Sequence, residues 1–465
     1  MSYIVKYRLC FHRPIFLFAL LFSLITSSAY ASEHHVMVIV SDRSAPTLVS
    51  GAHQLLQQQP DADIQIRTVS QLNALTDADL QQLIDNSASI LVVGVFGDPV
   101  ERLLVRQYNN DQKRYVLHSD QRLIELNSDP VTQSIPNHIL SDKASLSTTT
   151  LLEAKQVQYP EYANWLQARA YWVNRSTENS RSLLDMLLTE GSKKAELQPV
   201  GALRFALHKD DKTQWLSPTE LAKQLDTTNP VVWLVDHDTG DLTGEWKLHQ
   251  QYCQALNSQC VSVLAAWGEP SVEAIETIKK VMNKSLPNTP WGIVSFQDFV
   301  IGGGDGREQV EQLFTELNVP VLKGIRLNKL SEADYALSSQ GIPRDSIHYR
   351  IAMPELQGVS QPQILALTEP AKMDPQTGAQ LTQSLPIKEH INRQALRMQG
   401  WLALQQKDNA DKRVAIVYYN HPPGRHNIGA DNLNVPESLL EILNSLKNAG
   451  YQTGELPKDA ESLLD

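Results

Sequence analysis

Short apolar runs alternate with longer amphipathic runs along most of this chain, and this rhythm limits its possible folds more than any other feature. Strand-like runs lie at 36–40, 64–69 and 90–96, with helical patterns between and after them at 46–58, 75–85 and 100–109. These apolar runs do not alternate with polar residues, which indicates strands buried on both faces. We therefore predict a doubly wound parallel sheet, covered by helices on both sides, over residues 32–139.

The same rhythm returns after a segment at 140–228 that we predict to be mainly helical. Strand-like runs at 231–235, 260–264, 292–296 and 319–322 predict a second wound module over 229–356. A connector and helix are expected over 357–410, and a third sheet is expected to begin with a strand at 413–419. The predicted fold class is α/β, with two doubly wound (flavodoxin-like) parallel-sheet modules, a helical insertion and an incomplete third α/β domain at 411–465. Because one βα unit cannot bury its own sheet, this last part either adds to an earlier sheet or is the front piece of something longer.

The first 31 residues have the three parts of an export signal. Lys6, Arg8 and Arg13 precede an apolar run at 15–25, and Ala29-Tyr30-Ala31 has the small-x-small pattern of a cleavage site. The apolar run is shorter than the roughly 20 residues of a spanning helix, which favours cleavage over an uncleaved anchor. We predict a periplasmic protein with no membrane span after cleavage, in a compartment where free ATP is not expected.

Charge and cysteine content exclude two classes of protein. The chain has 41 Lys and Arg against 52 Asp and Glu, a formal net charge of −11 that becomes more negative once the basic signal is removed. Such a chain lacks the basic surface that phosphate neutralisation needs, so no nucleic-acid partner is predicted. Three cysteines cannot frame a disulfide scaffold of this length. Cys10 lies in the signal, and Cys253 and Cys260 are either bridged or two buried thiols.

Three stretches are candidates for chemistry. The glycine-rich loop at 302–306 follows a strand and opens a helix, where backbone amides can hold an anion, but a plain flexible turn is favoured. Asp236-His237-Asp238 ends the first strand of the second module, where α/β folds place reactive groups; the alternative is a solvated loop. The segment 421–429 carries two histidines and an arginine that suit a metal or a carboxylate, although its spacing matches no standard zinc pattern.

Several stretches together resemble the front half of the large subunit of cobaltochelatase (CobN), a family shared with the porphyrin-binding large subunit of magnesium chelatase. The closest match is 413–450, where Arg-Val-Ala-Ile-Val is followed by Asn-His-Pro-Pro-Gly and Asn-Ile-Gly-Ala. Residues 353–358 resemble the family's A-x-P-E-L-D-G turn, with Gln357 in place of the Asp. In the second module, Asp236-His237 replaces a Tyr-Arg pair, which puts any role of that arginine in doubt.

The resemblance implies binding of a tetrapyrrole, either a corrin or a porphyrin, with a divalent metal such as cobalt or iron as the second substrate. It also implies metal insertion, a ligase reaction that forms nitrogen–metal bonds, driven by separate AAA+ partner subunits. Export conflicts with that ATP-driven step. The leading hypothesis is therefore periplasmic tetrapyrrole or metal handling, by insertion or dechelation. The alternatives are a chelatase subunit completed by another chain or a missing C-terminal portion, a non-catalytic tetrapyrrole-binding or interaction module, and a truncated remnant.

The candidate site residues follow from the motifs and from the resemblance. A metal ligand or base is expected at one of the histidines of 421–429, because neutral imidazole serves both roles. An arginine there pairs with a propionate or acetamide edge of the macrocycle. The metal or catalytic candidates are His421 and His426, with Glu355 as a further catalytic candidate, and the tetrapyrrole-binding candidates are Arg425, Asn427, Gly429 and His237.

Overall fold

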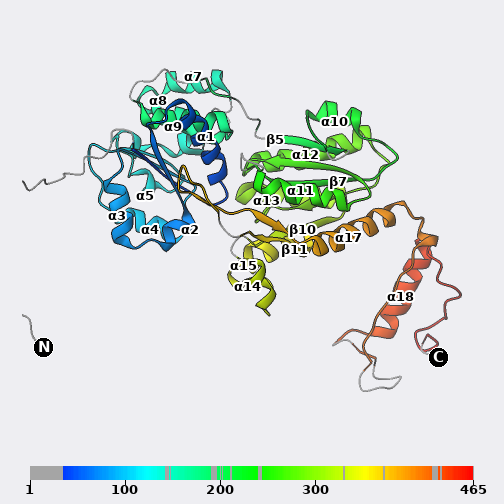
Figure 1. The fold of residues 1–465 in the computed structure, drawn as a ribbon. Coiled ribbons are helices and arrows are strands. Elements are labelled where there is room, and N and C mark those ends of the chain that lie inside the picture. The colour runs from blue at the N-terminus through cyan, green and yellow to red at the C-terminus, as the bar shows by residue number, and fades with distance from the viewer. Residues whose placement is uncertain are drawn as a thin grey trace, which may run out of the picture.

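The structure is a computed structural model that describes residues 35–141, 146, 148–189, 196–198, 201, 203–209, 212–238, 243–327, 330–369, 372–420, 428–429 and 432–463. The predicted export signal lies outside these residues. Two α/β modules stand side by side, and a helical arm leads from the second module to the C-terminal part of the chain (Figure 1). Within the described residues, no helix is both long enough and apolar enough to cross a membrane.

The first module is built on a four-stranded parallel sheet. Its strands are β1 (His35–Val40), β2 (Asp63–Thr68), β3 (Ser89–Val93) and β4 (Lys113–Leu117), in the order β2-β1-β3-β4. Val36, Val38 and Val40 of β1 pack into one core, and Met37 and Ile39 pack into the core on the opposite face. Because helices cover both faces, β1 needs no polar alternation, as predicted from its sequence.

The helices of the first module divide between these two cores. The core that contains the three β1 valines is closed by α1 (Ala45–Gln58), α8 (Ala163–Val173) and α9 (Thr177–Leu188). The opposite core is closed by α2 (Val69–Ala74), α3 (Asp77–Asp85) and α4 (Asp98–Leu104). Thr68 starts α2 with a capping box, in which its side chain and that of Gln71 each satisfy a backbone amide of the first turn.

The second module is built on an eight-stranded mixed sheet. Five neighbouring strands are parallel, in the order β8-β7-β9-β10-β11, and antiparallel strands flank them on both sides. In chain order the parallel strands read 2-1-3-4-5, which is the flavodoxin-like doubly wound order. The strands are β5 (Leu203–Lys209), β6 (Lys212–Leu216), β7 (Val231–His237), β8 (Gln259–Ala265), β9 (Trp291–Ser295), β10 (Val321–Arg326), β11 (Ser360–Thr368) and β14 (Ser384–Pro386).

Helices also cover both faces of this sheet. Buried side chains of α10 (Pro218–Gln224), α12 (Glu269–Ser285) and α13 (Gly303–Leu317) fill one core. Those of α11 (Thr243–Ala255) and α17 (Lys388–Gln406) fill the other. Val231, Trp233 and Val235 of β7 face the first of these cores, and Val232 and Leu234 face the second.

A hairpin from the second module binds the two modules together. Its strands are β12 (Lys372–Met373) and β13 (Gln380–Leu381). The carbonyl of Thr377 accepts a 3.0 Å hydrogen bond from the backbone amide of Ile66 in β2, and Asp374 lies 2.8 Å from Nε2 of His53 in α1. Ala379 is buried within the core of the first module. The hairpin thus reaches from the second module to the edge strand β2 of the first sheet (Figure 1).

Besides the unexpected strand β4 of the first module, three segments differ from the expectations drawn from the sequence. Residues 203–209 and 212–216, within the segment expected to be mainly helical, form the antiparallel pair β5–β6 and make the second sheet mixed. Residues 360–368, expected to be connector, form the fifth parallel strand, in which only Leu365, Ala366 and Leu367 are buried. Each of these strands buries three side chains or fewer, so its sequence carries too weak an apolar signal to be recognised.

The predicted third sheet is the other difference. Residues 413–419 belong to none of the three sheets that the structure describes. Helix α18 (Val435–Asn448) follows this segment and stands at the end of the arm, away from both sheets (Figure 1). The apolar run therefore lacks the neighbouring strands that would make it part of a sheet.

Candidate functional site

Charged side chains gather where the carboxyl ends of the two parallel sheets meet. Asp236 and Arg326 lie at the ends of β7 and β10, and Asp298 lies three residues beyond β9. Arg43, in the turn after β1 of the first module, reaches both carboxylates: its Nη2 lies 3.1 Å from Oδ1 of Asp236, and its Nη1 lies 3.6 Å from Oδ2 of Asp298. In open α/β sheets this edge is where ligands bind, so the two modules bring their binding edges together.

Asp236 is the centre of this cluster, and its side chain is only 2% exposed. Arg326 donates two hydrogen bonds to its carboxylate, at 2.5 and 2.7 Å, and Nε2 of His249 lies 3.0 Å from Oδ2. The backbone amide of His237 donates a further bond of 2.7 Å. Burial alone would raise the pKa of Asp236, but the charges of Arg326 and Arg43 outweigh it and hold that pKa well below its usual range. Asp236 therefore remains a carboxylate at neutral pH, and both of its oxygens accept hydrogen bonds.

Cations outnumber carboxylates in the cluster. Nη2 of Arg350 lies 3.8 Å from Asp298, and the ammonium of Lys323 donates to the carbonyl of Gln297. Burial lowers the pKa of Lys323 to about 8, so it remains mostly charged at neutral pH. Four cationic side chains, counting Arg43 and Arg326, thus face the two carboxylates of Asp236 and Asp298. The excess positive charge lies where water screens it poorly, and it favours an anionic group.

An aromatic surface adjoins the cluster. The rings of His237 and Trp267 lie 5.1 Å apart, and Trp267 stacks on Phe299 at 6.1 Å with an interplanar angle of 18°. Trp267 is 44% exposed. Gly303, at the start of α13, has φ of +69°, and a Cβ atom at this position would lie 3.2 Å from the Trp267 ring. Glycine therefore allows the indole to lie close against the backbone of the glycine-rich loop.

His237 supplies an unsatisfied polar atom beside this aromatic surface. Burial, with a further contribution from Arg43, lowers the pKa of His237 to about 3, so its imidazole is neutral at neutral pH. Its Nδ1 is buried and has no hydrogen-bond partner among the described residues. A buried polar atom without a partner costs free energy unless a ligand or water satisfies it.

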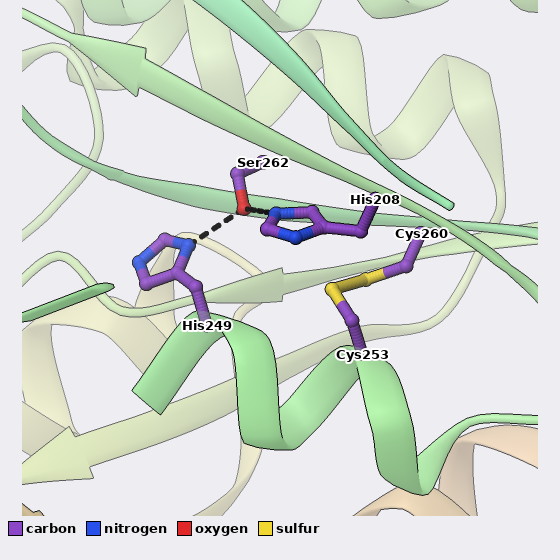
Figure 2. Close-up of a disulfide and its surroundings, with 5 residues drawn as sticks. All are labelled: His208, His249, Cys253, Cys260 and Ser262. Carbon is purple, nitrogen blue, oxygen red and sulfur yellow. Dashed lines mark hydrogen bonds between the residues drawn. A yellow bond between two sulfur atoms is a disulfide. The ribbon is translucent and has the colours of Figure 1, made fainter. Parts of the chain in front are cut away.

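A chain of hydrogen bonds leads from Asp236 into the second sheet. Nδ1 of His249 lies 2.7 Å from the hydroxyl of Ser262, which lies 2.8 Å from Nε2 of His208 (Figure 2). In the arrangement where His249 carries a proton only on Nε2 and donates it to Asp236, its Nδ1 accepts from Ser262, and His208 donates to the Ser262 oxygen. Ser262 is fully buried in the middle of β8, so the array positions Asp236 and does not present a nucleophile.

A disulfide holds the two elements that carry this array. Cys253 in the last turn of α11 is bonded to Cys260 near the start of β8, with Cα atoms 5.5 Å apart (Figure 2). Of the two interpretations of these cysteines, the structure therefore supports the bridge. His249 lies one helical turn before Cys253, and Ser262 lies two residues after Cys260, so the bridge joins the backbones whose side chains make the 2.7 Å contact.

The structure places only some of the predicted site residues. His237 is in the cluster, as its position at the end of a strand suggested. Glu355 is exposed on the short helix α16 (Met353–Leu356), whereas the neighbouring Gln357 is buried and bonds through its side chain to the amide and carbonyl of Ile301. Gly429 follows Ile428, which forms an isolated bridge with Asn420. The remaining candidates lie outside the described residues: His421, Arg425, His426 and Asn427.

Sequence reasoning missed most of the cluster. Arg43, Arg326 and Asp298 each follow or end an apolar run, so the rule that places ligands at the carboxyl ends of parallel strands would have found them. Trp267 follows β8 and is found by the same rule. His249 lies inside a helix, where sequence carries no such signal. In the part of the chain that the structure describes, no three or more His, Cys, Asp and Glu side chains are arranged to hold a metal.

Comparisons with known proteins show which family the chain resembles. The model of the CobN/magnesium chelatase family matches residues 169–465. The chain is 23% identical to the magnesium-chelatase H protein of Chlorobaculum parvum over 68% of its own length and 25% of that protein. It is 22% identical to the aerobic cobaltochelatase protein CobN of a Sinorhizobium species over 48% of its length and 17% of that protein.

A solved structure agrees with these sequence comparisons. The catalytic subunit of cobaltochelatase from Mycobacterium tuberculosis shares the fold with a TM-score of 0.51, at 16% identity. The match covers 93% of this chain and 32% of that subunit. The chain thus spans a quarter or less of these two curated relatives and about a third of the solved subunit.

Proposed function

Because the chain belongs to the CobN/magnesium chelatase family, we propose that it binds a tetrapyrrole and takes part in inserting or removing its metal. One observation carries the proposal: four cationic side chains face two carboxylates at the joined sheet edges, beside the stacked surface of Trp267 and Phe299. A tetrapyrrole is flat, and its rim carries carboxylates or acetamides. Aromatic rings suit its face, and guanidinium groups suit its rim.

Each component of the site has a defined part in this proposal. Arg43 and Arg350 are the cations nearest to Asp298, whose side chain is 26% exposed, so an anionic edge would approach them there. The exposed face of Trp267 would stack against the macrocycle. The buried Nδ1 of His237, which has no partner among the described residues, would form a hydrogen bond with it. His421 and His426 stay the predicted metal ligands or bases, Arg425 the predicted partner of a propionate or acetamide, and Asn427 and Gly429 the residues that shape the turn.

We also propose that the protein works outside the cytosol. The disulfide between Cys253 and Cys260 supports this location, because disulfides persist in oxidising compartments such as the periplasm. The signal-like first 31 residues support it independently. A full chelatase cycle would then need further subunits or further chain, with an energy source other than free ATP, whereas binding or dechelation would need neither.

Absorbance titration tests the binding proposal directly. Haem, cobalamin and a metal-free porphyrin are titrated separately, and we expect a Soret or corrin-band shift with at least one of them. Trp267→Ala should weaken that binding about tenfold, which corresponds to the roughly 1.4 kcal/mol of one aromatic stacking contact. Trp215→Ala is the matched control, because Trp215 is also 44% exposed but lies on β6 at the far edge of the sheet.

The same titration separates the two groups of candidate residues. Replacing His421 and His426 together with Ala should lower affinity for the metal-containing macrocycles more than affinity for the metal-free porphyrin. Unchanged affinity for all three ligands would remove these histidines from the site. No spectral shift with any ligand would contradict the proposed function. Binding without metal exchange, after incubation with cobalt or iron salts, would favour the non-catalytic binding module.

A further inference from the structure

A second group of polar side chains lies at the carboxyl ends of β3 and β4 in the first module. His118 directly follows β4, and Phe96 lies three residues beyond β3. On α8, the indole of Trp165 donates a 3.0 Å hydrogen bond to the carbonyl of Val116 near the end of β4. The guanidinium of Arg169 lies over the Trp165 ring, 5.0 Å from its centroid. Arg169 and His118 therefore share the edge of the sheet where α/β folds bind ligands.

His118 offers a hydrogen-bond donor that no described residue accepts. It is 5% exposed, and its Nδ1 accepts a 2.9 Å bond from the backbone amide of Asp120. Burial, with a smaller contribution from the charge of Arg169, lowers the pKa of His118, so the imidazole is neutral at neutral pH. Because Nδ1 accepts, the single proton of this ring lies on Nε2. Nε2 is buried and has no hydrogen-bond partner among the described residues, although the carbonyl of Val95 lies nearby.

Arg169 is a buried cation without a counter-charge in the part of the chain that the structure describes. It is 6% exposed, and burial lowers its pKa to about 10, so it stays charged at neutral pH. Nη2 donates to the carbonyl of Leu140, and Nε is buried without a partner. The acid beside His118 does not serve, because Asp120 is bound by Arg122 at 2.8 Å. A buried charge that is left unpaired costs free energy unless a ligand neutralises it.

The unsatisfied groups define the ligand. Arg169 and His118 supply N–H donors and positive charge, so the ligand has to supply acceptor oxygens and negative charge. The Phe96 ring lies 4.7 Å from the His118 ring and is 67% exposed, so His118 lies one side chain below the surface. Because His118 and Arg169 are themselves almost completely buried, only a small ligand reaches both of them.

We infer that Arg169 and His118 form a binding site for a small carboxylate, such as formate or acetate, at the carboxyl ends of β3 and β4. The carboxylate oxygens accept hydrogen bonds from Nε of Arg169 and from Nε2 of His118, and the negative charge neutralises the buried guanidinium. A macrocycle is too large to reach these side chains. The site is therefore separate from the one proposed for the tetrapyrrole, and the inference does not depend on that function.

Titration with acetate, followed by NMR, tests this site. The full chain with 15N-labelled histidine is titrated at constant ionic strength, and His118→Gln identifies the His118 signal among those of the 13 histidines. We expect the Nε2 resonance of His118 to shift saturably with sodium acetate and not with sodium chloride. Arg169→Met should weaken acetate binding at least about tenfold, because a hydrogen bond to a charged group contributes more than about 1.4 kcal/mol.

Two further variants keep the result specific. Arg114→Met is the matched control, because Arg114 on β4 also lies over an aromatic ring, 5.5 Å from the centroid of Tyr108, but its guanidinium donates to the carbonyls of Leu126 and Asn109. It should leave the affinity for acetate unchanged. Arg169→Lys keeps the charge but not the planar fork of donors, so it should bind acetate more weakly than the wild type and more tightly than Arg169→Met. It also provides the comparison if Arg169→Met does not fold.

Three results would overturn the inference. The first is a His118 resonance in the wild type that does not shift saturably with acetate. The second is an equal shift with chloride, or an equal shift of most other histidines, because the response would then be a general effect of salt. The third is an equal loss of acetate affinity in Arg114→Met and Arg169→Met, because the loss would then not be specific to the buried guanidinium.

Discussion

Strand β7 and the segment 413–419 have similar sequences and opposite environments. Residues 231–235 read Val-Val-Trp-Leu-Val and are completely buried between two layers of helices. Residues 414–418 read Val-Ala-Ile-Val-Tyr and include the 93% exposed Val417. An apolar run favours a buried strand. Whether the run is buried depends on the strands and helices that pack beside it. β7 has β8 and β9 on its two sides, and this support allows it to hold a buried carboxylate at its end.

The largest expected effect comes from Asp236 at the end of β7. Asp236→Asn leaves the buried guanidinium of Arg326 without its counter-charge, so the free energy of unfolding should fall by about 3–5 kcal/mol in a urea titration. Asp77→Asn is the control, because Asp77 also pairs with two arginines, Arg102 and Arg106, but is exposed. The control should unfold close to wild type. Equal effects of the two changes would mean that burial of the cluster contributes nothing.

The disulfide beside β7 should have the next largest effect. Replacing Cys253 and Cys260 together with Ser should lower the free energy of unfolding by about 2.5 kcal/mol, the value expected for closing a loop of this length. A dithiol reductant should shift the wild type by the same amount and leave the double variant unchanged. Trp246, which stacks on His249 at 5.2 Å, reports the local change through its fluorescence. If the reductant also destabilised the double variant, its effect on the wild type could not be assigned to the disulfide between Cys253 and Cys260.

A matched pair of valines tests the comparison itself. Val235→Ala in β7 removes fully buried methyl groups, so it should lower the free energy of unfolding by about 2 kcal/mol. Val417→Ala removes the same groups from an exposed site and should change it by less than about 0.5 kcal/mol. Thermal unfolding of both variants in one buffer provides the measurement. If Val417→Ala destabilised the chain as much as Val235→Ala, the segment 413–419 would have to be covered within this chain.

The last expected effect is a dependence of stability on pH, which is small near neutrality and grows as the pH falls. Burial lowers the pKa of His237 to about 3 and that of His208 to about 4 in the folded protein. In the unfolded chain, a histidine has a pKa near 6.5. Between these values the unfolded chain binds protons that the folded protein does not. Stability is therefore complete above about pH 6.5 and is lost as the pH falls toward these values. Each histidine contributes up to about 1.4 kcal/mol per pH unit.

Two measurements check this pH dependence. The free energy of unfolding of the wild type should fall between pH 6.5 and pH 4, and His237→Asn should lose less over the same range. Asp236 adds to the loss only at lower pH, because its carboxylate keeps a depressed pKa. An identical slope for wild type and variant would show that His237 takes up its proton without unfolding.

Much of the fold could be predicted from the sequence because it depends on local patterns. Continuous apolar runs separated by amphipathic stretches predicted two doubly wound modules, and both have the expected parallel strands. The family resemblance, carried by short motifs around 353–358 and 413–450, is confirmed by the family model. His237 was identified because the sequence locates the carboxyl end of its strand, which is where α/β folds bind ligands. The β5–β6 hairpin and β11 were missed because these strands bury too few side chains to show the pattern.

The rest of the site depends on distances that no local pattern encodes. Arg43 and Asp236 are 193 residues apart in the chain, and they meet because the hairpin at 372–381 holds the first module against the second. The state of Cys253 and Cys260 was open until α11 and β8 were placed side by side. The spacing of apolar residues along the chain predicts which face of each helix or strand is buried, because that spacing is a local property of the sequence. Contacts between buried charged groups from distant elements depend on how the layers of the two modules pack. Only the tertiary structure determines that packing.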